Sequence, residues 1–452
     1  MKCHKKNGYS YEYVKFVAEL DHHDVPTFKN DLEWLYDGFF WRTIPFGVGS
    51  NLPPTFINYV VKAEGFSFAS FSLMFTIGTI ISAVCSPFIG KLFTKVNVKV
   101  LYIIASILVG VGFMAFAFAG NHLIAYYILA GIVQVGVATM SSIGVPTLIN
   151  AWFKVNKGTA MGIAFSGGGL GNIFLQMIAG KWLSDPAIGY KGAYIRFGAI
   201  ALVISLILSI FFVRMPKSKE ELEANIPKKK KGDENATHHI SWGYTVSEAT
   251  KMPQFWMIGI SFIFVGFYVS GVALQFIAYL QSIEEAGILL IPSARIASMF
   301  GLFSIFGSIL GGMLFDKLGL AKSYSFAGIL VVIACLCLIF IPNMNFLGYV
   351  FPICFGISLF AYIMGPSYMT GVLFGDREYS AILGIIQIFF ALGFAIGSPI
   401  FGATIDNFGW TVGWITTIIY TIIAYIGLVL SCSMILKINK ENNVIETKRI
   451  SE

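Results

Sequence analysis

Uncharged polar side chains deep within long apolar stretches are the residues of this chain that could contact a bound molecule. Amides and hydroxyls donate and accept hydrogen bonds without carrying charge, which suits recognition of a small polar solute. Any one of them is better explained as a hydrogen bond between helices, but as a set they predict a polar cavity. The candidate substrate-binding residues are Asn51, Gln134, Gln275, Ser304, Ser308, Tyr362 and Gln387, and Asn172 and Gln176 add two further amides.

Ionisable groups lie towards the ends of the same stretches, at Arg42, Arg196 and Arg295. A charge inside a bilayer is costly and indicates function, but these arginines are shallow enough to reach the interface with their long side chains. We interpret them as interface anchors. Arg295 is the best candidate among them for a substrate contact, and Arg42 and Asp37 are weak candidates for ion coupling, Asp37 being better explained as a helix cap.

The sequence lacks the residue patterns that acid–base catalysis, metal binding or nucleotide binding would require. No Asp or Glu lies deep in an apolar stretch, and the six cysteines have no metal-ligand spacing. An enzyme would need paired titratable groups in a cavity, and an ATP-driven pump would need a phosphate-binding loop, which is absent. The sequence therefore predicts no enzyme, no metal and no cofactor.

The elements that must position these side chains are membrane helices. Of the 452 residues 56% are hydrophobic and 12% charged, against about 25% charged in soluble domains. Stretches of about 20 apolar residues span the hydrocarbon layer, and they must be helical because lipid satisfies no backbone group. We count twelve: 39–61, 67–90, 98–119, 122–149, 158–182, 190–213, 254–281, 293–315, 321–341, 346–373, 380–404 and 411–436.

Basic residues orient these spans. With both termini in the cytoplasm, all but five of the 31 Lys and Arg lie on the cytoplasmic side, as the positive-inside rule requires. The net charge of +7 then reflects loop orientation rather than nucleic-acid binding. We predict a plasma (inner) membrane protein without a cleavable signal peptide. Its parts are a tail (1–38), a six-helix half (39–213), a central loop (214–253), a second half (254–436) and a tail (437–452).

A repeat at an offset of 222 residues supports the two halves. Gly90–Lys95 reappears as Gly312–Lys317, and Gly162, Gly171 and Gly180 reappear as Gly384, Gly393 and Gly402. Duplicated halves in an apolar chain are typical of transporters whose site lies where the halves meet.

The repeated loop resembles the signature of the major facilitator superfamily. Gly312–Gly319 is similar to its Gly-x-x-x-Asp-basic-x-Gly motif, in which Asp316 and Lys317 are expected to cap a helix and latch the halves. The first copy, beginning at Gly90, has Thr94 in the place of the aspartate, so its latch should be weaker or different. The resemblance implies twelve helices in two pseudo-symmetric halves.

A narrower resemblance is to the monocarboxylate transporters and the related oxalate/formate antiporters. Trp152–Gly167 is similar to their signature at the start of span five, and Asp37–Phe40 to their span-one start, although Arg42 replaces an expected Trp. Phe374–Arg377 also resembles these relatives. The family carries a buried arginine, preceded by an aspartate, in span eight; those places hold Ser308 and Ser304 here.

Glycines leave bare helix faces that permit close packing or sliding. We expect gating roles for Gly162, Gly167 and Gly171 in span five and for Gly393 in span eleven, where Pro399 should add a kink. Tight packing without motion explains the same glycines.

These patterns predict a secondary transporter that moves a small organic solute, above all a monocarboxylate or related anion, by alternating access. The alternative is an exporter of neutral or amphipathic metabolites or drugs, which the missing deep cations favour. A membrane sensor is disfavoured because both tails are short. The predicted partners are the solute, the lipid bilayer and a co- or counter-transported ion.

Overall fold

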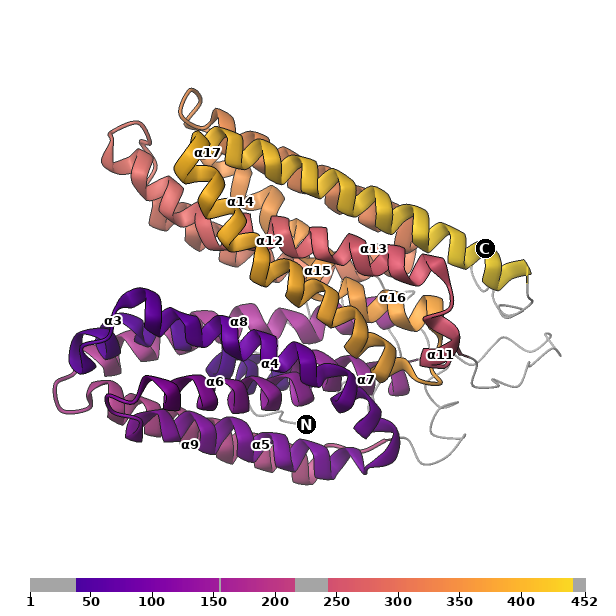
Figure 1. The fold of residues 1–452 in the computed structure, drawn as a ribbon, viewed down its shortest axis with the longest axis horizontal. Helices are drawn as coiled ribbons and strands as arrows, with labels where there is room; N and C mark the ends of the chain where they lie inside the picture. Colours follow the sequence, from indigo (N-terminus) through magenta and orange to yellow (C-terminus); the bar gives the residue numbers. More distant parts are fainter. Residues whose placement is uncertain (1–37, 154–155, 216–242, 442–452) are drawn as a thin grey trace, which may run out of the picture.

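The computed structural model describes residues 38–153, 156–215 and 243–441. These residues form long helices that run side by side in two groups (Figure 1). No β-strand occurs in the described ranges, where Gly243 and Gly375 form an isolated bridge. The predicted all-α membrane fold is confirmed.

The first group runs from the start of span one to Phe211. Its elements are η1 (Gly47–Asn51), α3 (Pro53–Glu64), α4 (Phe68–Lys95), α5 (Val98–Ala115), η2 (Phe116–Phe118), α6 (Leu123–Val137), η3 (Ala138–Ile143), α7 (Gly144–Trp152), α8 (Lys157–Ser184) and α9 (Gly189–Phe211). Both η1 and η3 are π-helical, so span one and span four each contain one irregular segment.

The second group runs from Val246 to Glu441. Its elements are α11 (Val246–Ala249), α12 (Pro253–Glu285), α13 (Ser293–Phe340), α14 (Leu347–Ser358), α15 (Phe360–Ile363), α16 (Gly365–Phe374) and α17 (Tyr379–Glu441). Helices α14 to α16 together form one span, bent by 41° near Met364.

Two of these helices are too long for one crossing. α13 has 48 residues and α17 has 63, so straight helices would be about 72 and 95 Å long against a hydrocarbon core of about 30 Å. Each contains a non-helical glycine, Gly319 with φ 75° and Gly409 with φ 80°. Such angles favour glycine because it has no Cβ. Each helix is therefore two spans.

Eight helices are long and apolar enough to span a membrane, or nine if the bent pair counts as one span. Dividing α13 and α17 at their glycines, and adding the span-one segment that contains η1 and α3, brings the count to the predicted twelve. Large apolar side chains such as Phe88 and Met177 are exposed, as expected for a protein whose surface is covered by lipid.

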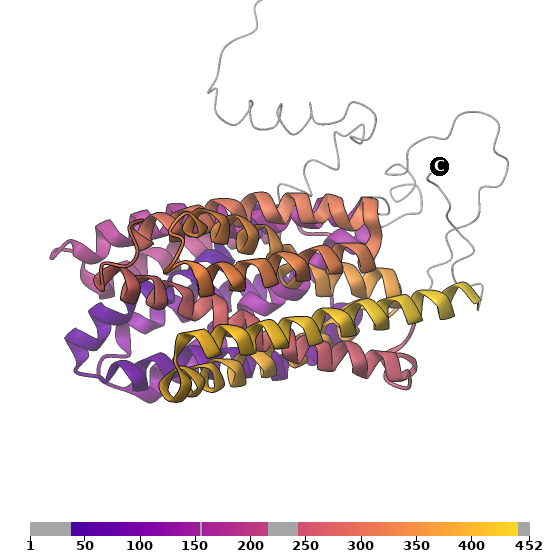
Figure 2. The same cartoon turned by 90° about the horizontal axis from the view of Figure 1, so that it is seen from above.

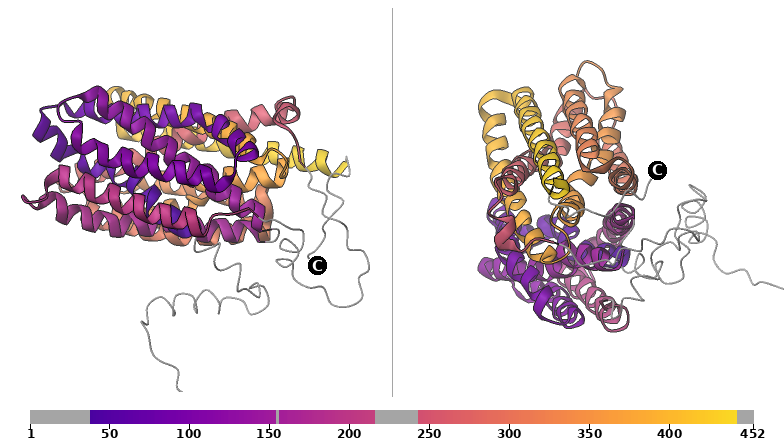
Figure 3. Two further views of the ribbon diagram at one scale, coloured as in Figure 1. Left: turned by 90° about the horizontal axis from the view of Figure 1, so that it is seen from below. Right: turned by 90° about the vertical axis from the view of Figure 1, so that its right-hand side faces the viewer.

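The two groups meet along two helix pairs. α8 packs against α13, and α4 packs against α17. Seen end-on in Figure 3, the first group lies on one side and the second group on the other. Figure 2 shows the same helices running roughly parallel along the length of the molecule. Side chains on these four helices therefore occupy the boundary where a solute site is expected.

Candidate functional site

The α-helix of span one is interrupted beside Asn51, the candidate amide residue of this span. Its π-helix, η1, is followed by Leu52 and by Pro53 and Pro54, which lack backbone N–H groups. The carbonyl of Gly49 accepts a hydrogen bond of 3.1 Å from Gln134 Nε2, and that of Asn51 accepts one of 3.0 Å from Gln176 Nε2. Amides of spans four and five therefore stabilise the irregular backbone.

Further hydrogen bonds join the same amides into one network. Asn51 Nδ2 donates to the carbonyl of Gly168 at 3.2 Å, and Thr55 Oγ1 donates to Gln176 Oε1 at 2.5 Å. Ser50 Oγ donates to Gln134 Oε1 at 3.5 Å. The structure thus brings Asn51 and Gln134 together, but as partners of backbone and side chains between helices.

The candidates of the second half do not join this network. Ser304 and Ser308 donate to carbonyls of their own helix, at 2.7 and 3.0 Å. Gln275 and Gln387 are half-buried and make no hydrogen bond with another described residue. Arg295 lies exposed in the first turn of α13.

Arg42 is the buried cation of the described chain. It is 5% exposed, which contradicts its interpretation as an interface anchor. Its guanidinium carbon lies 3.8 Å from the ring centroid of Phe165 and 4.4 Å from that of Phe46, and its Nη1 donates to Ser141 Oγ at 3.1 Å. Tyr362, from the second half, lies within electrostatic range of the guanidinium. Asp37, the other coupling candidate, lies outside the described residues.

Asp316 contacts the start of a helix in the other half. Its carboxylate accepts hydrogen bonds from the backbone N–H of Gly158 at 2.9 Å, and from the N–H and Oγ1 of Thr159, both at 2.7 Å. Asn156, the residue before α8, has φ 54° and gives no side-chain cap. The carboxylate therefore supplies the cap that α8 lacks and lies at the positive end of its dipole. Lys317, beside it, is exposed.

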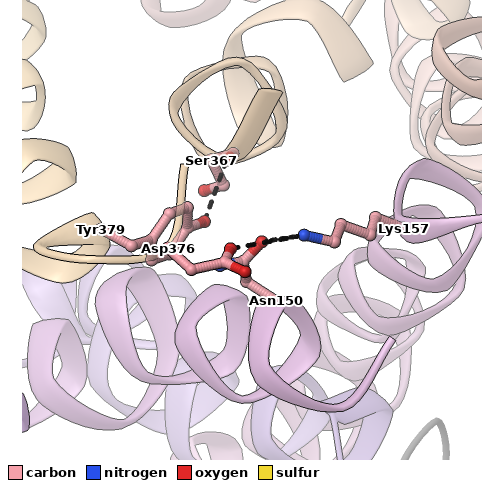
Figure 4. Close-up of polar contacts among 5 residues, drawn as sticks. All are labelled: Asn150, Lys157, Ser367, Asp376 and Tyr379. Carbon is pink, nitrogen blue, oxygen red and sulfur yellow. Dashed lines mark hydrogen bonds and ion pairs between the residues drawn. The ribbon is translucent and has the colours of Figure 1, made fainter. Parts of the chain in front are cut away.

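A second polar cluster joins the halves nearby (Figure 4). Asn150 Nδ2 donates to Asp376 Oδ1 at 2.7 Å, and Lys157 Nζ donates to Asn150 Oδ1 at 2.6 Å. Lys157 Nζ also lies 3.6 Å from Asp376 Oδ1. Tyr379 OH donates to the carbonyl of Ser367 at 2.9 Å, which fixes the start of α17 beside the cluster.

Glycines allow backbone contact between α8 and α13. A Cβ added to Gly312 would overlap the carbonyl oxygen of Gly158, and one added to Gly158 would overlap that of Gly312. One helical turn further on, a Cβ at Gly162 would overlap the carbonyl oxygen of Ser308. Any side chain at these glycines would push the halves apart.

The same contact is found between α4 and α17. A Cβ at Gly90 would overlap the carbonyl oxygen of Ser380, and one at Gly384 would overlap that of Ser86. These four residues are related to Gly312, Gly158, Gly162 and Ser308 by the 222-residue offset. The repeat of the sequence is therefore a repeat of contacts across the interface.

The other candidate gating residues pack within their own halves. Gly167 and Gly171 face carbonyl groups of span one, and Gly393 faces a carbonyl of α12. α17 continues through the exposed Pro399, and its non-helical residue is Gly409 instead. Gly409 separates the two predicted spans 380–404 and 411–436, and the kink at Pro399 stays a prediction.

The family model of the Major Facilitator Superfamily matches residues 43–372. The chain belongs to this superfamily. It is therefore a membrane-embedded transporter of small molecules rather than an enzyme, and the predicted resemblance is confirmed.

Relatives of this superfamily protein include the oxalate:formate antiporter of Oxalobacter formigenes, 27% identical over 383 residues, which is 82% of this chain and 84% of that one. Monocarboxylate transporter 12 of Xenopus laevis is 23% identical over 72% of each chain. The uncharacterized MFS-type transporter YhjX of Escherichia coli (strain K12) is 24% identical over 70% of this chain and 73% of its own.

Solved structures with the same fold include FucP in the outward conformation, with a TM-score of 0.64 and 15% identity, covering 90% of this chain and 98% of that one. The human organic anion transporter MFSD10 has a TM-score of 0.60 and 14% identity over 88% of this chain and 96% of its own.

In this superfamily protein the hydrogen bonds between halves gather at one end of the bundle. We name this end, which carries Asn150, Lys157, Asp316 and Asp376, the latch end; it also includes a hydrogen bond of 2.9 Å between Thr147 and Ser380. At the opposite end, where α3 lies in Figure 1, the described residues form no hydrogen bond or ion pair between the halves. Sequence reasoning missed Asn150 and gave Asp376 no role, although the motif Phe374–Arg377 contained the latter.

Proposed function

We propose that this chain is a secondary active transporter that moves a small organic solute, above all a monocarboxylate or related organic anion, by alternating access. The halves rock about a site at their boundary and expose it first to one side of the membrane and then to the other. A co- or counter-transported ion drives the movement.

The observation that carries this proposal is the closure of one end only. The latch end is held by hydrogen bonds of Asp316 to the start of α8 and by the cluster around Asp376. These bonds are few, and the glycine contacts beside them need no side chain to rearrange. Alternating access requires the two halves to separate at the latch end and to come together at the opposite end.

The orientation and the solute class belong to the same proposal. With both termini in the cytoplasm of a cell whose plasma membrane holds the protein, the latch end faces the cytoplasm. The relatives named for oxalate, formate and monocarboxylates support a carboxylate substrate.

One observation favours an exporter of neutral compounds instead. Ser304 and Ser308 bond to their own helix and offer no charge. A transporter that relied on these positions alone would have no reason to prefer an anion.

Flux in liposomes decides between the two. The purified full-length protein is reconstituted with unlabelled formate, acetate, lactate or oxalate inside, and uptake of the labelled compound is followed. Saturable exchange of carboxylates, absent from empty liposomes, is the expected result. Saturable uptake of uncharged sugars or alcohols with no carboxylate exchange contradicts the anion, and no saturable flux of any compound contradicts transport.

A further inference from the structure

Arg42 is a buried charge whose hydrogen-bonding needs are not met within the protein. Among the described residues it is the only buried Lys or Arg, and no described carboxylate pairs with it. Its Nη1 bonds to Ser141, whereas its Nε is buried without a hydrogen-bond partner. Burying a cation without enough hydrogen-bond acceptors is strongly unfavourable, and buried cations in proteins are normally paired with an anion.

The aromatic rings beside Arg42 offset only part of this cost. Phe46 and Phe165 lie over the guanidinium at 4.4 and 3.8 Å from their centroids. Cation–π contacts of this kind contribute about 0.5–2 kcal/mol each, against several kcal/mol for desolvating an ion. Aromatic rings cannot replace the acceptors that the guanidinium N–H groups need, and these donors lie in the guanidinium plane.

Tyr362 is the side chain of the second half that interacts electrostatically with Arg42. It lies within electrostatic range of Arg42, and its ring stacks on Phe390 at 5.8 Å. Its hydroxyl makes no hydrogen bond with another described residue, so it remains available as a donor. A cation from one half and a phenol from the other therefore interact electrostatically across the boundary between the halves, where a transported solute is expected to bind.

We propose that Arg42 and Tyr362 form the anion site of this transporter, and that the site takes a single carboxylate. The Arg42 fork matches the two oxygens of a carboxylate, and the tyrosine hydroxyl donates to one of them. One buried cation balances one negative charge, so a second carboxylate would be left unpaired in an apolar environment. Monocarboxylates with a short apolar tail, which Phe46 and Phe165 can cover, are therefore preferred over dicarboxylates such as oxalate.

This inference rests on the proposed transport function. It links binding of the anion to the movement of the two halves. Arg42 and Tyr362 belong to different halves, so the rocking of the halves changes their separation. An anion that bridges them favours the conformation in which they are close, and its absence removes that preference.

The experiment uses the full-length protein, both in detergent and in liposomes. Arg42→Gln, Arg42→Lys and Tyr362→Phe are compared with wild type and with Arg196→Gln. The last is a matched control because Arg196 is exposed and also lies over an aromatic ring, that of Trp182 at 5.4 Å. Binding is measured as thermal stabilisation by formate, acetate, lactate and oxalate, and transport as exchange of the labelled anions.

Arg42→Gln should weaken monocarboxylate binding at least about 30-fold and abolish exchange, since it removes the charge from a buried hydrogen-bonded pair. Arg42→Lys keeps the charge but loses the fork and should bind with intermediate affinity, and Tyr362→Phe should bind about 2- to 10-fold more weakly. The control should match wild type, which should prefer monocarboxylates to oxalate.

Two results overturn the assignment of the site. They are unchanged exchange and stabilisation in Arg42→Gln, or, if that variant does not fold, unchanged affinity in both Arg42→Lys and Tyr362→Phe. A wild-type protein that prefers oxalate overturns the single-carboxylate selectivity. Wild-type protein that neither exchanges nor is stabilised by any carboxylate contradicts the proposed function itself.

Discussion

Replacing Gly312 by alanine should open the latch end. The added Cβ would overlap the carbonyl oxygen of Gly158, whereas ordinary contacts begin at 3.4 Å. The two backbones would have to part by about 1 Å, and overpacking of this kind costs about 1–3 kcal/mol. Because the strain exists only while the latch end is closed, it shifts the balance of two conformations by about 5- to 150-fold.

Distances between spin labels measure this shift. Labels at the exposed Lys95 and Leu318, one in each half, are introduced after the six native cysteines have been replaced. Gly312→Ala should enlarge the population with the longer distance. Gly301→Ala, in the same helix but facing open space, is the matched control and should leave the distances unchanged. An unchanged distribution in Gly312→Ala would refute the role given to this contact.

Three further predictions concern other bonds described above. Asp316→Ala removes the cap of α8, which is worth about 1–2 kcal/mol. It should raise the population that is open at the latch end in the same spin-label assay. Thr94→Ala, at the equivalent position of the first half, should leave that population unchanged. Asn150→Ala removes the hydrogen bonds through which Asn150 joins Lys157 to Asp376. Closure of the latch end would then depend more on the 3.6 Å ion pair between these two residues and should become more sensitive to salt, and equal salt dependence in variant and wild type would speak against it. Gln176→Leu leaves the Asn51 carbonyl without its donor and should reduce stability by about 1–3 kcal/mol in thermal unfolding. An unchanged unfolding temperature would contradict the network.

The fold follows from the sequence because membrane helices depend on local composition. Apolar stretches of spanning length, a repeated Gly-rich loop and the asymmetry of basic residues are all visible in one dimension. Irregular backbone within a span is less visible: the π-helix η1 interrupts span one, and nothing in the composition of that span indicates it. Its carbonyls accept hydrogen bonds from Gln134 and Gln176, which lie on other helices.

The site was only partly predictable because its contacts join distant segments. Arg42 looked shallow in the sequence, and only the fold brings Phe165 over it. Asn150 and Asp376 are 226 residues apart, and neither lies in a pattern that indicates a partner. Asp316 was recognisable because its motif is repeated, yet the helix start that it caps became known from the structure.

The contacts of Gly90 with Ser380 and of Gly312 with Gly158 are equivalent under the 222-residue offset. Gly90 of the first half contacts Ser380 of the second half. The residues equivalent to them, Gly312 and Gly158, make the same contact with the two halves exchanged. This exchange is the definition of an isologous interface. The molecule is thus built like a twofold homodimer whose two subunits have been joined into one chain. Each half carries both surfaces that such a dimer needs, and divergence at positions such as Thr94 and Asp316 has made the two copies of the contact unequal.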